Sequence, residues 1–243
     1  LFLFILGALT SLSLPPFNYI IINFLTLGLF FIYIFQKKRS TKRQHSFAYG
    51  WFFGAGYFLT NLYWITISLT FDENFNFLIP IALILIPSFL ALFYGLATYC
   101  FFLLKIKKPS SNLFLFSLLF GLVEFLRGNI LTGFPWNLIA YSFSENLEIL
   151  QIISFIGTYS FNILCISFFA SPAILILREN RKEIFVCIFF LLSPIALYIA
   201  GSSKIKSFQS SSIINNDYII RVIGSKIDLD RFYGNTDTAA VIN

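Results

Sequence analysis

The sequence has few charged residues: Asp, Glu, Lys and Arg make up 12% of its 243 residues, whereas hydrophobic residues make up 58%. A soluble domain carries about 25% charged residues, so this chain could not cover its surface in water. Its mean hydropathy of +0.81 agrees. Methionine is absent while Phe occurs 33 times, a bias that we attribute to codon usage in an AT-rich genome. The scarcity of charge predicts a membrane protein.

Histidine and cysteine are also scarce. His45 is the only histidine and lies among basic residues, which excludes a Ser-His-acid catalytic group, and no phosphate-binding loop or metal-ligand spacing is found. Cys100, Cys165 and Cys187 all lie in apolar runs, so we expect buried, inert thiols and no disulfide framework. We therefore expect no catalytic residue, no metal and no cofactor in this sequence.

Apolar runs that cross a ~30 Å hydrocarbon core need about 20 residues as a helix. On this basis we expect a mainly α protein, a polytopic transmembrane helical bundle of about seven spans. The predicted spans are 1–14, 18–35, 46–70, 77–104, 112–126, 152–177 and 184–200. The first begins at Leu1 without an initiating Met, which predicts a clipped N-terminus. Pro15 and Pro16 favour a turn after it, not a signal-peptide cleavage site.

The basic residues before residue 200 predict the orientation of the bundle. All except Arg127 fall in three connections, within 37–43, 105–108 and 178–182. With seven spans these connections alternate onto one face, which the positive-inside rule places in the cytoplasm. We expect a cytoplasmic N-terminus and an external C-terminal tail. The net charge of +6 then matches the anionic cytoplasmic leaflet, and no motif indicates a nucleic-acid partner.

Composition changes at Gly201. Residues 1–200 are predicted to form the bundle, and 201–217, GSSKIKSFQSSSIINND, are polar and Ser-rich as in a linker. The following YIIRVI alternates and is β-branched, which predicts a strand. One strand without a partner is not stable. We therefore expect 218–243 to be the start of a truncated domain, in preference to a disordered tail.

The stretch EFLRGNILTGFPWN, residues 124–137, places ionisable groups at the end of an apolar run. Such groups are costly at a membrane boundary unless they are paired or functional. Glu124 and Arg127 share a helix face and can pair. One interpretation is that Arg127 snorkels to the interface and Glu124 neutralises it. The other is that the pair orients a polar head group or the loop that follows.

The sequence predicts a rigid loop after this helix. Gly133 permits a tight turn, and Pro135 fixes its own backbone and biases Phe134 toward an extended conformation. Trp136 then lies at the membrane–water boundary. Aromatic anchors are common there, but an anchor does not need this fixed backbone. An interfacial anchor and a role in handling a substrate are therefore both open at this point.

A second aromatic group ends the third predicted span, which contains YGWFFGAGYFLTNLYW. Gly50, Gly54 and Gly56 permit close approach of neighbouring helices. Tyr63 and Trp64 lie toward the outer end of the span, where they could line a site for an acyl chain or a head group.

These segments resemble a known family. EFLRGNILTGFPWNLIAYS resembles the signature loop of apolipoprotein N-acyltransferases, which are bacterial inner-membrane enzymes. LPPFN at the first hairpin, YGWFFGAGYFLTNLYWI and the predicted strand match the same family in order, over residues 1–225. The resemblance implies an inner (plasma) membrane protein with eight spans and a periplasmic α/β nitrilase-like domain before the last span. Gly133 and Trp136 match loop residues that the family uses near the substrate.

The resemblance also implies a reaction. The family transfers an acyl chain from a phospholipid donor to the N-terminal diacylglyceryl-cysteine of a lipoprotein acceptor, using a Glu base, a Lys oxyanion stabiliser and a Cys nucleophile. The chain stops before these residues. We therefore expect a truncated membrane part that is inactive alone, or one for which a separate chain supplies the catalytic domain. The expected substrate- or lipid-binding residues are Trp136, Gly133, Phe134, Pro135, Glu124, Arg127, Tyr63 and Trp64.

Other functions stay open. The bundle could be a lipid-binding or scaffold membrane protein without catalysis, in which Trp136 contacts acyl chains. A small transporter is less favoured, because Glu124 is the only candidate acid within a span and no inverted repeat is found.

Overall fold

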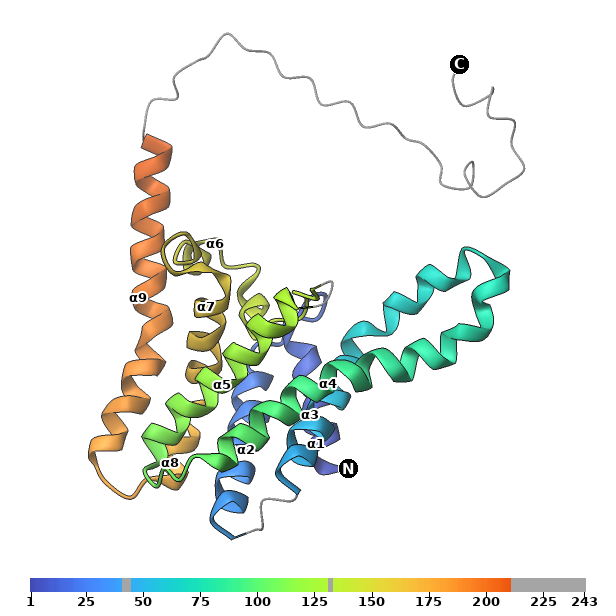
Figure 1. Cartoon of the computed structure of the whole chain (residues 1–243). Helices are drawn as coiled ribbons and strands as arrows, with labels where there is room; N and C mark the ends of the chain where they lie inside the picture. Colours follow the sequence, from blue (N-terminus) through green and yellow to red (C-terminus); the bar gives the residue numbers. More distant parts are fainter. Residues whose placement is uncertain (41–44, 131–132, 211–243) are drawn as a thin grey trace.

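The computed structural model describes residues 1–40, 45–130 and 133–210. These residues form a helical bundle without a strand, which confirms the prediction of a mainly α protein (Figure 1). The elements are α1 (Phe2–Thr10), η1 (Ser11–Ser13), α2 (Ile22–Ser40), α3 (Ser46–Leu62), η3 (Tyr63–Thr70), η4 (Glu73–Leu78), α4 (Ile79–Leu103), α5 (Pro109–Asn129), η5 (Ile139–Phe143), α6 (Leu147–Leu150), α7 (Ile153–Ala170), α8 (Ala173–Leu177) and α9 (Lys182–Ser210).

Among the described residues, 4 helices are long and apolar enough to cross a membrane: the segment Glu73–Leu103, α5, α7 and α9. Phe2–Ser13 is a shorter apolar helix. Helix α3 has 17 residues, and α2 carries three bases in its last turn, so neither belongs to this group. The chain is therefore a multi-pass membrane protein, and its division into seven spans stays a prediction.

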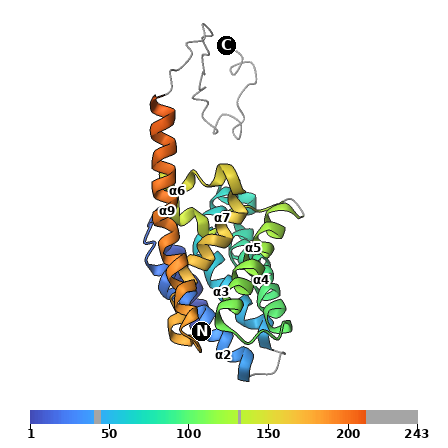
Figure 2. The same cartoon turned by 90° about the vertical axis from the view of Figure 1, so that its left-hand side faces the viewer.

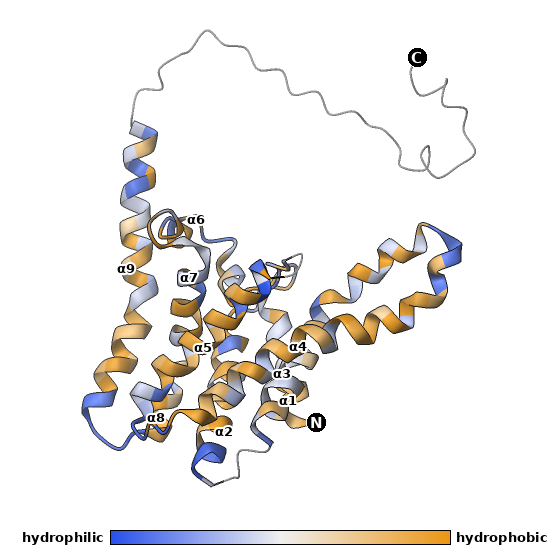
Figure 3. Cartoon of the chain, viewed as in Figure 1, coloured by the Kyte–Doolittle hydropathy of each residue, from blue (hydrophilic) through white to orange (hydrophobic). Residues whose placement is uncertain are grey.

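The predicted basic connections lie at one end of the bundle. The last turn of α2, the α4–α5 connection and the α8–α9 connection share this end, and the N-terminus lies toward it (Figure 1). The α8–α9 connection and the last turn of α2 are hydrophilic there, whereas the helices between the two ends are largely apolar (Figure 3). We call this the basic end. The C-terminal end of α9 lies at the opposite end in both side views (Figures 1 and 2).

Phenylalanine and tyrosine rings fill the core between α2, α3, α4 and α5. Phe30 stacks on Phe53 with ring centroids 4.1 Å apart, and it meets Phe120 edge-on at 5.6 Å. Tyr94 meets Phe120 edge-on at 5.1 Å. Edge-on and stacked arrangements at these distances are the favoured ones for aromatic pairs. These contacts pack the four helices together behind the candidate site described below.

Small residues let α3 lie close to its neighbours, as the sequence predicts. A Cβ on Gly56 would lie 2.0 Å from the carbonyl oxygen of Phe4 in α1, and a Cβ on Gly50 would lie 2.1 Å from that of Tyr94 in α4. A Cβ on Gly54 would likewise lie 3.1 Å from the Cα atom of Ala91 in α4. The three glycines therefore permit backbone-to-backbone approach on both sides of α3.

The third predicted span, 46–70, is α-helical only as far as Leu62. The remainder is the 3₁₀ helix η3, in which no residue is buried. The side-chain hydroxyls of Thr66, Ser68 and Thr70 each donate to the carbonyl three residues earlier. Such local bonds compete with the α-helical pattern. Together with η4 and the start of α4, η3 projects from the bundle (Figure 1).

The predicted span 152–177 is also divided. Gly157 has φ of +77° inside α7, and α8 starts only at Ala173, after Pro172. A left-handed glycine interrupts a helix, and proline cannot donate the bond that would continue one.

The helix that contains the last predicted span, 184–200, extends beyond residue 200. Helix α9 continues to Ser210, so the first ten residues of the predicted linker are helical. Gly201 lies so close to α6 that a Cβ would be 1.8 Å from the carbonyl oxygen of Glu148, and Lys204 Nζ donates to Ser154 Oγ at 2.6 Å. These contacts favour helix over linker. Residues 211–217 and the predicted strand and domain start at 218–243 lie outside the described residues.

Candidate functional site

A buried ion pair lies at the end of α5. Glu124 is 1% exposed and Arg127 is 2% exposed. Arg127 Nε donates to Glu124 Oε2 at 2.8 Å, and Tyr94 Oη donates to Glu124 Oε1 at 2.5 Å. Both carboxylate oxygens are therefore paired, as a buried charge requires. The interpretation that Arg127 snorkels to the interface is wrong, because its guanidinium is enclosed by protein groups.

Arg127 also holds the loop that follows. Its Nη1 donates to the carbonyl oxygen of Phe134 and its Nη2 to that of Trp136, both at 2.7 Å. In return, the amide of Phe134 donates to the carbonyl oxygen of Arg127 at 2.9 Å. The planar guanidinium thus joins one carboxylate and two backbone carbonyls. This matches the interpretation that the pair orients the loop.

A third carbonyl fixes the same loop. Tyr57 Oη donates to the carbonyl oxygen of Asn137 at 2.8 Å, and Tyr57 itself is fully buried. Gly133 and Asn137 both have positive φ, at +73° and +62°, a region that glycine and asparagine adopt most readily. The prediction of a tight turn at Gly133 is confirmed. With three carbonyls turned into the bundle, the Trp136 side chain is left 56% exposed.

Trp136 packs edge-on against a second tryptophan at the wall of a cleft. Its ring lies 5.9 Å from that of Trp64, at an interplanar angle of 64°. The cleft has a volume of about 630 Å³ and is lined by the first hairpin, by the α3–η3 junction with Tyr63 and Trp64, and by Pro135, Trp136 and Asn137. Segments that are far apart in the sequence, and that the sequence analysis singled out separately, therefore meet at one place.

The cleft is uncharged and presents hydrogen-bond acceptors. No Lys, Arg, His, Asp or Glu lines it among the described residues. The hydroxyls of Ser11, Thr60 and Tyr141 already donate to backbone carbonyls, so their lone pairs remain available. The Oδ1 atom of Asn137 is buried and has no partner among the described groups. With its aromatic rings, amides and hydroxyls, this lining suits a ligand that has apolar chains and an uncharged or weakly polar hydrogen-bonding group.

Burial raises the pKa of Tyr141 above its ordinary value, and the neighbouring Tyr159 adds to the shift. The Tyr141 hydroxyl is therefore protonated at neutral pH and can keep its bond to the carbonyl oxygen of Pro135 at 3.1 Å. Pro135 and its neighbours are in this way fixed from the cleft side as well as from the bundle side.

Polar residues within apolar runs hold the far end of the loop. Asn23 Nδ2 donates to Ser142 Oγ at 2.9 Å, and the amide of Ala140 donates to Asn162 Oδ1 at 3.0 Å. Both asparagines are fully buried. The sequence analysis missed them, together with Tyr57 and Tyr94. The sequence does contain a signal for the two asparagines, because each stands alone in an apolar run and a buried amide needs hydrogen-bond partners.

The predicted site residues thus divide into two groups. Glu124, Arg127 and Gly133 shape the loop from behind, while Pro135, Trp136, Tyr63 and Trp64 line the cleft. Phe134 lies under the guanidinium, with its ring centroid 5.7 Å from the Arg127 Cζ atom. Within 1–40, 45–130 and 133–210, no three His, Cys, Asp or Glu side chains come together as a metal site would require.

Comparison with known proteins gives one family. Residues 6–171, which include every residue of the cleft, match the family model described as the apolipoprotein N-acyltransferase N-terminal domain. An apolipoprotein N-acyltransferase of Rhodopseudomonas palustris is 39% identical over 176 residues, 70% of this chain and 32% of the relative. The protein of the same name from Brucella melitensis biotype 1 is 35% identical over 248 residues, 99% of this chain and 46% of the relative. The chain therefore spans less than half the length of either curated relative.

Proposed function

The chain belongs to the apolipoprotein N-acyltransferase family, and from this premise we propose that it forms the membrane part of such an enzyme and binds a lipid substrate in the cleft beside Trp136. One observation carries the proposal. Arg127, buried in an ion pair with Glu124, holds the backbone carbonyl of Trp136, whose side chain is exposed at the cleft. Evolution rarely keeps a charge in a membrane bundle without such a use. A volume of about 630 Å³ lies within the usual range for ligand sites.

The proposed ligands are the phospholipid acyl donor and the lipoprotein acceptor. Trp64 and Trp136 offer apolar ring faces to an acyl chain, while Thr60, Asn61 and Ser144 add polar side chains to the lining. The relatives are named as transferring an acyl group to nitrogen. The described residues supply binding and positioning groups. The nucleophile, base and oxyanion donor that the resemblance implies would come from a nitrilase-like catalytic part or from a separate chain.

We also propose an orientation in a bacterial inner membrane. The bases of three connections gather at the basic end, and the cleft lies toward the other end of the helices. The positive-inside rule then places the N-terminus and the basic end in the cytoplasm. The cleft and the C-terminal end of α9 would face the periplasm, where the family's lipoprotein acceptor is expected. Cysteine-scanning with a membrane-impermeant reagent at Lys107 and at Tyr63 tests this, because only Tyr63→Cys should react from outside.

The alternatives differ in what the buried charges do. A lipid-binding protein without catalysis would use the same cleft. A lipid-binding assay therefore supports both this alternative and the acyltransferase proposal, and an acylation assay separates the two. A transporter needs an ionisable group that is free to change its partner. Glu124 has both oxygens engaged by Arg127 and Tyr94, so the described structure favours lipid binding over transport.

The deciding experiment measures the phospholipid that co-purifies with the chain. We expect Trp136→Ala to retain several-fold less phospholipid, and Trp136→Phe to retain an intermediate amount because part of the ring surface remains. Tyr198→Ala is the control, since Tyr198 is 48% exposed on α9 and lines no part of the cleft. Equal lipid content in Trp136→Ala and the parent chain, with unchanged thermal unfolding, would reject the cleft as the lipid site.

A further inference from the structure

Two connections at the basic end carry six exposed bases. They are Lys105, Lys107 and Lys108 between α4 and α5, and Arg178, Arg181 and Lys182 at the α8–α9 connection, where Lys182 is the first residue of α9. Only two ion pairs occur among the described residues, Arg39–Glu179 and Arg127–Glu124. None of the six bases takes part in either of them, so none is paired directly with an acid of this part of the chain.

A buried acid brings the two connections together. Glu183, at the start of α9, is 7% exposed. Its Oε1 accepts from both the amide and the hydroxyl of Ser110 at 3.4 Å, and its Oε2 accepts from the amide of Glu179 at 3.0 Å. A carboxylate at the first turn of α5 also suits the helix dipole. Glu183 therefore joins the two groups of bases into one corner instead of neutralising them.

The bases of α2 behave differently from these six. Lys38 Nζ donates to Asn112 Oδ1 at 2.7 Å and lies over the Phe101 ring at 4.1 Å from its centroid. Arg39 pairs with Glu179 at 2.9 Å. Two of the three bases of α2, Lys38 and Arg39, are thus engaged in contacts with other parts of the bundle, whereas the six at the corner are exposed.

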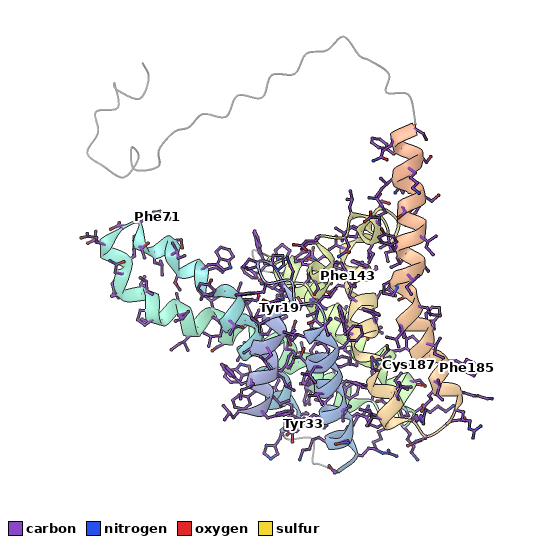
Figure 4. All side chains as sticks on the ribbon, turned by 180° about the vertical axis from the view of Figure 1, so that it is seen from behind. Tyr19, Tyr33, Phe71, Phe143, Phe185 and Cys187 are labelled. Carbon is purple, nitrogen blue, oxygen red and sulfur yellow. The ribbon has the colours of Figure 1, made fainter. Side chains whose placement is uncertain are left out.

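Exposed apolar side chains alternate with the corner bases or follow them. Ile106 stands between Lys105 and Lys107 and is 37% exposed, and Phe185, one turn into α9, is 73% exposed. The Phe185 side chain points away from the bundle (Figure 4). Phe114 on α5 is 51% exposed, and its ring lies 5.5 Å from that of Phe190 on α9. The corner thus combines exposed positive charge with an apolar surface.

We propose that this corner binds an anionic phospholipid, with the phosphate between the two groups of bases and the acyl chains along Phe114 and Phe185. Bases at a membrane surface attract anionic lipids, and a phospholipid also covers the apolar side chains beside them. A nucleic acid or an acidic protein would match the charge but would make no contact with the apolar side chains beside it. The site is separate from the cleft and does not depend on acyl transfer.

The test measures the binding of phosphatidylglycerol to the purified, delipidated chain by native mass spectrometry, with phosphatidylcholine as the reference lipid. Lys107→Gln with Arg181→Gln removes one exposed base from each connection. Each base removed should weaken binding about fivefold, so we expect roughly 25-fold weaker phosphatidylglycerol binding by the double variant. The substitutions should have a smaller effect at high salt. Lys204→Gln with Lys206→Gln removes equal charge at the far end of α9 and should leave binding unchanged.

A second variant separates a lipid from other anions. Phe185→Ala should weaken phosphatidylglycerol binding several-fold but leave the binding of heparin, a soluble polyanion, unchanged. Equal affinity for both lipids, or equal losses in the two double variants, would overturn the proposal. A heparin affinity above that for the lipid, with no effect of Phe185→Ala on lipid binding, would assign the corner to a soluble polyanion instead.

Discussion

The cleft end and the basic end of the bundle use charge in opposite ways. Near the cleft, one ion pair is buried and its hydrogen bonds fix backbone atoms of the loop around Trp136. At the basic end, six bases face outward and the buried acid Glu183 joins two connections. The comparison teaches that burial, and not the number of charges, decides whether a charged residue fixes the chain or stays accessible at the surface.

The largest expected difference in stability is between breaking the buried ion pair and breaking the exposed one. Arg127→Ala leaves Glu124 buried without its cation, which costs about 3–5 kcal/mol of unfolding free energy. Arg39→Ala breaks the exposed pair with Glu179 and should cost about 0–1 kcal/mol. Unfolding of the two variants in the same detergent gives the measurement. Similar costs for both would show that the two ends do not differ as described.

The next effect concerns the helix contact behind the cleft. Gly56→Ala places a methyl group against the Phe4 carbonyl and should cost about 1–3 kcal/mol, because α1 and α3 must move apart. Gly28→Ala is the control, since nothing lies within 4 Å of a Cβ there, and alanine favours a helix. Melting temperatures decide between them. A neutral Gly56→Ala would contradict the close approach of these helices.

A smaller effect is expected from a single hydroxyl. Tyr57→Phe removes the bond to the carbonyl oxygen of Asn137 and should cost about 0.5–1.5 kcal/mol. It should also lower phospholipid retention, because Asn137 lines the cleft. Tyr49→Phe, on the same helix toward the basic end, should leave lipid retention unchanged. If both variants retain lipid equally, Tyr57 does not position the loop for a ligand.

The last prediction concerns the pH dependence of stability at the basic end. Lys38 lies beyond the apolar part of α2, and burial lowers its pKa to about 8. Since the unfolded value is about 10.4, the unfolded chain binds more protons between pH 8 and 10.4, and stability rises with pH across this window. Lys38→Met should flatten that rise relative to the parent chain. An equal rise in thermal unfolding temperature from pH 8 to 10 in both would contradict the assignment.

Part of the fold and part of the candidate site could be predicted from the sequence. The helical membrane class, the close approach at Gly50, Gly54 and Gly56, and the turn at Gly133 follow from composition and local geometry. The i, i+3 spacing of Glu124 and Arg127 allows their pairing. These features depend on residues near one another in the chain or on properties of single residue types.

The remainder depends on contacts between distant residues. Tyr57 and Tyr94 complete the loop's support from α3 and α4, and nothing in their own sequence neighbourhoods indicates those partners. The helical course of 201–210 depends on packing against α6, which a polar, Ser-rich composition conceals. The meeting of the first hairpin with the end of α3 at one cleft likewise required the fold.

The Arg127 guanidinium contacts the loop through the carbonyls of Phe134 and Trp136, and a carbonyl is present whatever side chain a residue carries. Side chains of the loop that line the cleft can therefore be exchanged during evolution while the backbone stays anchored. Single substitutions can in this way change the surface of the cleft without changing the position of the loop.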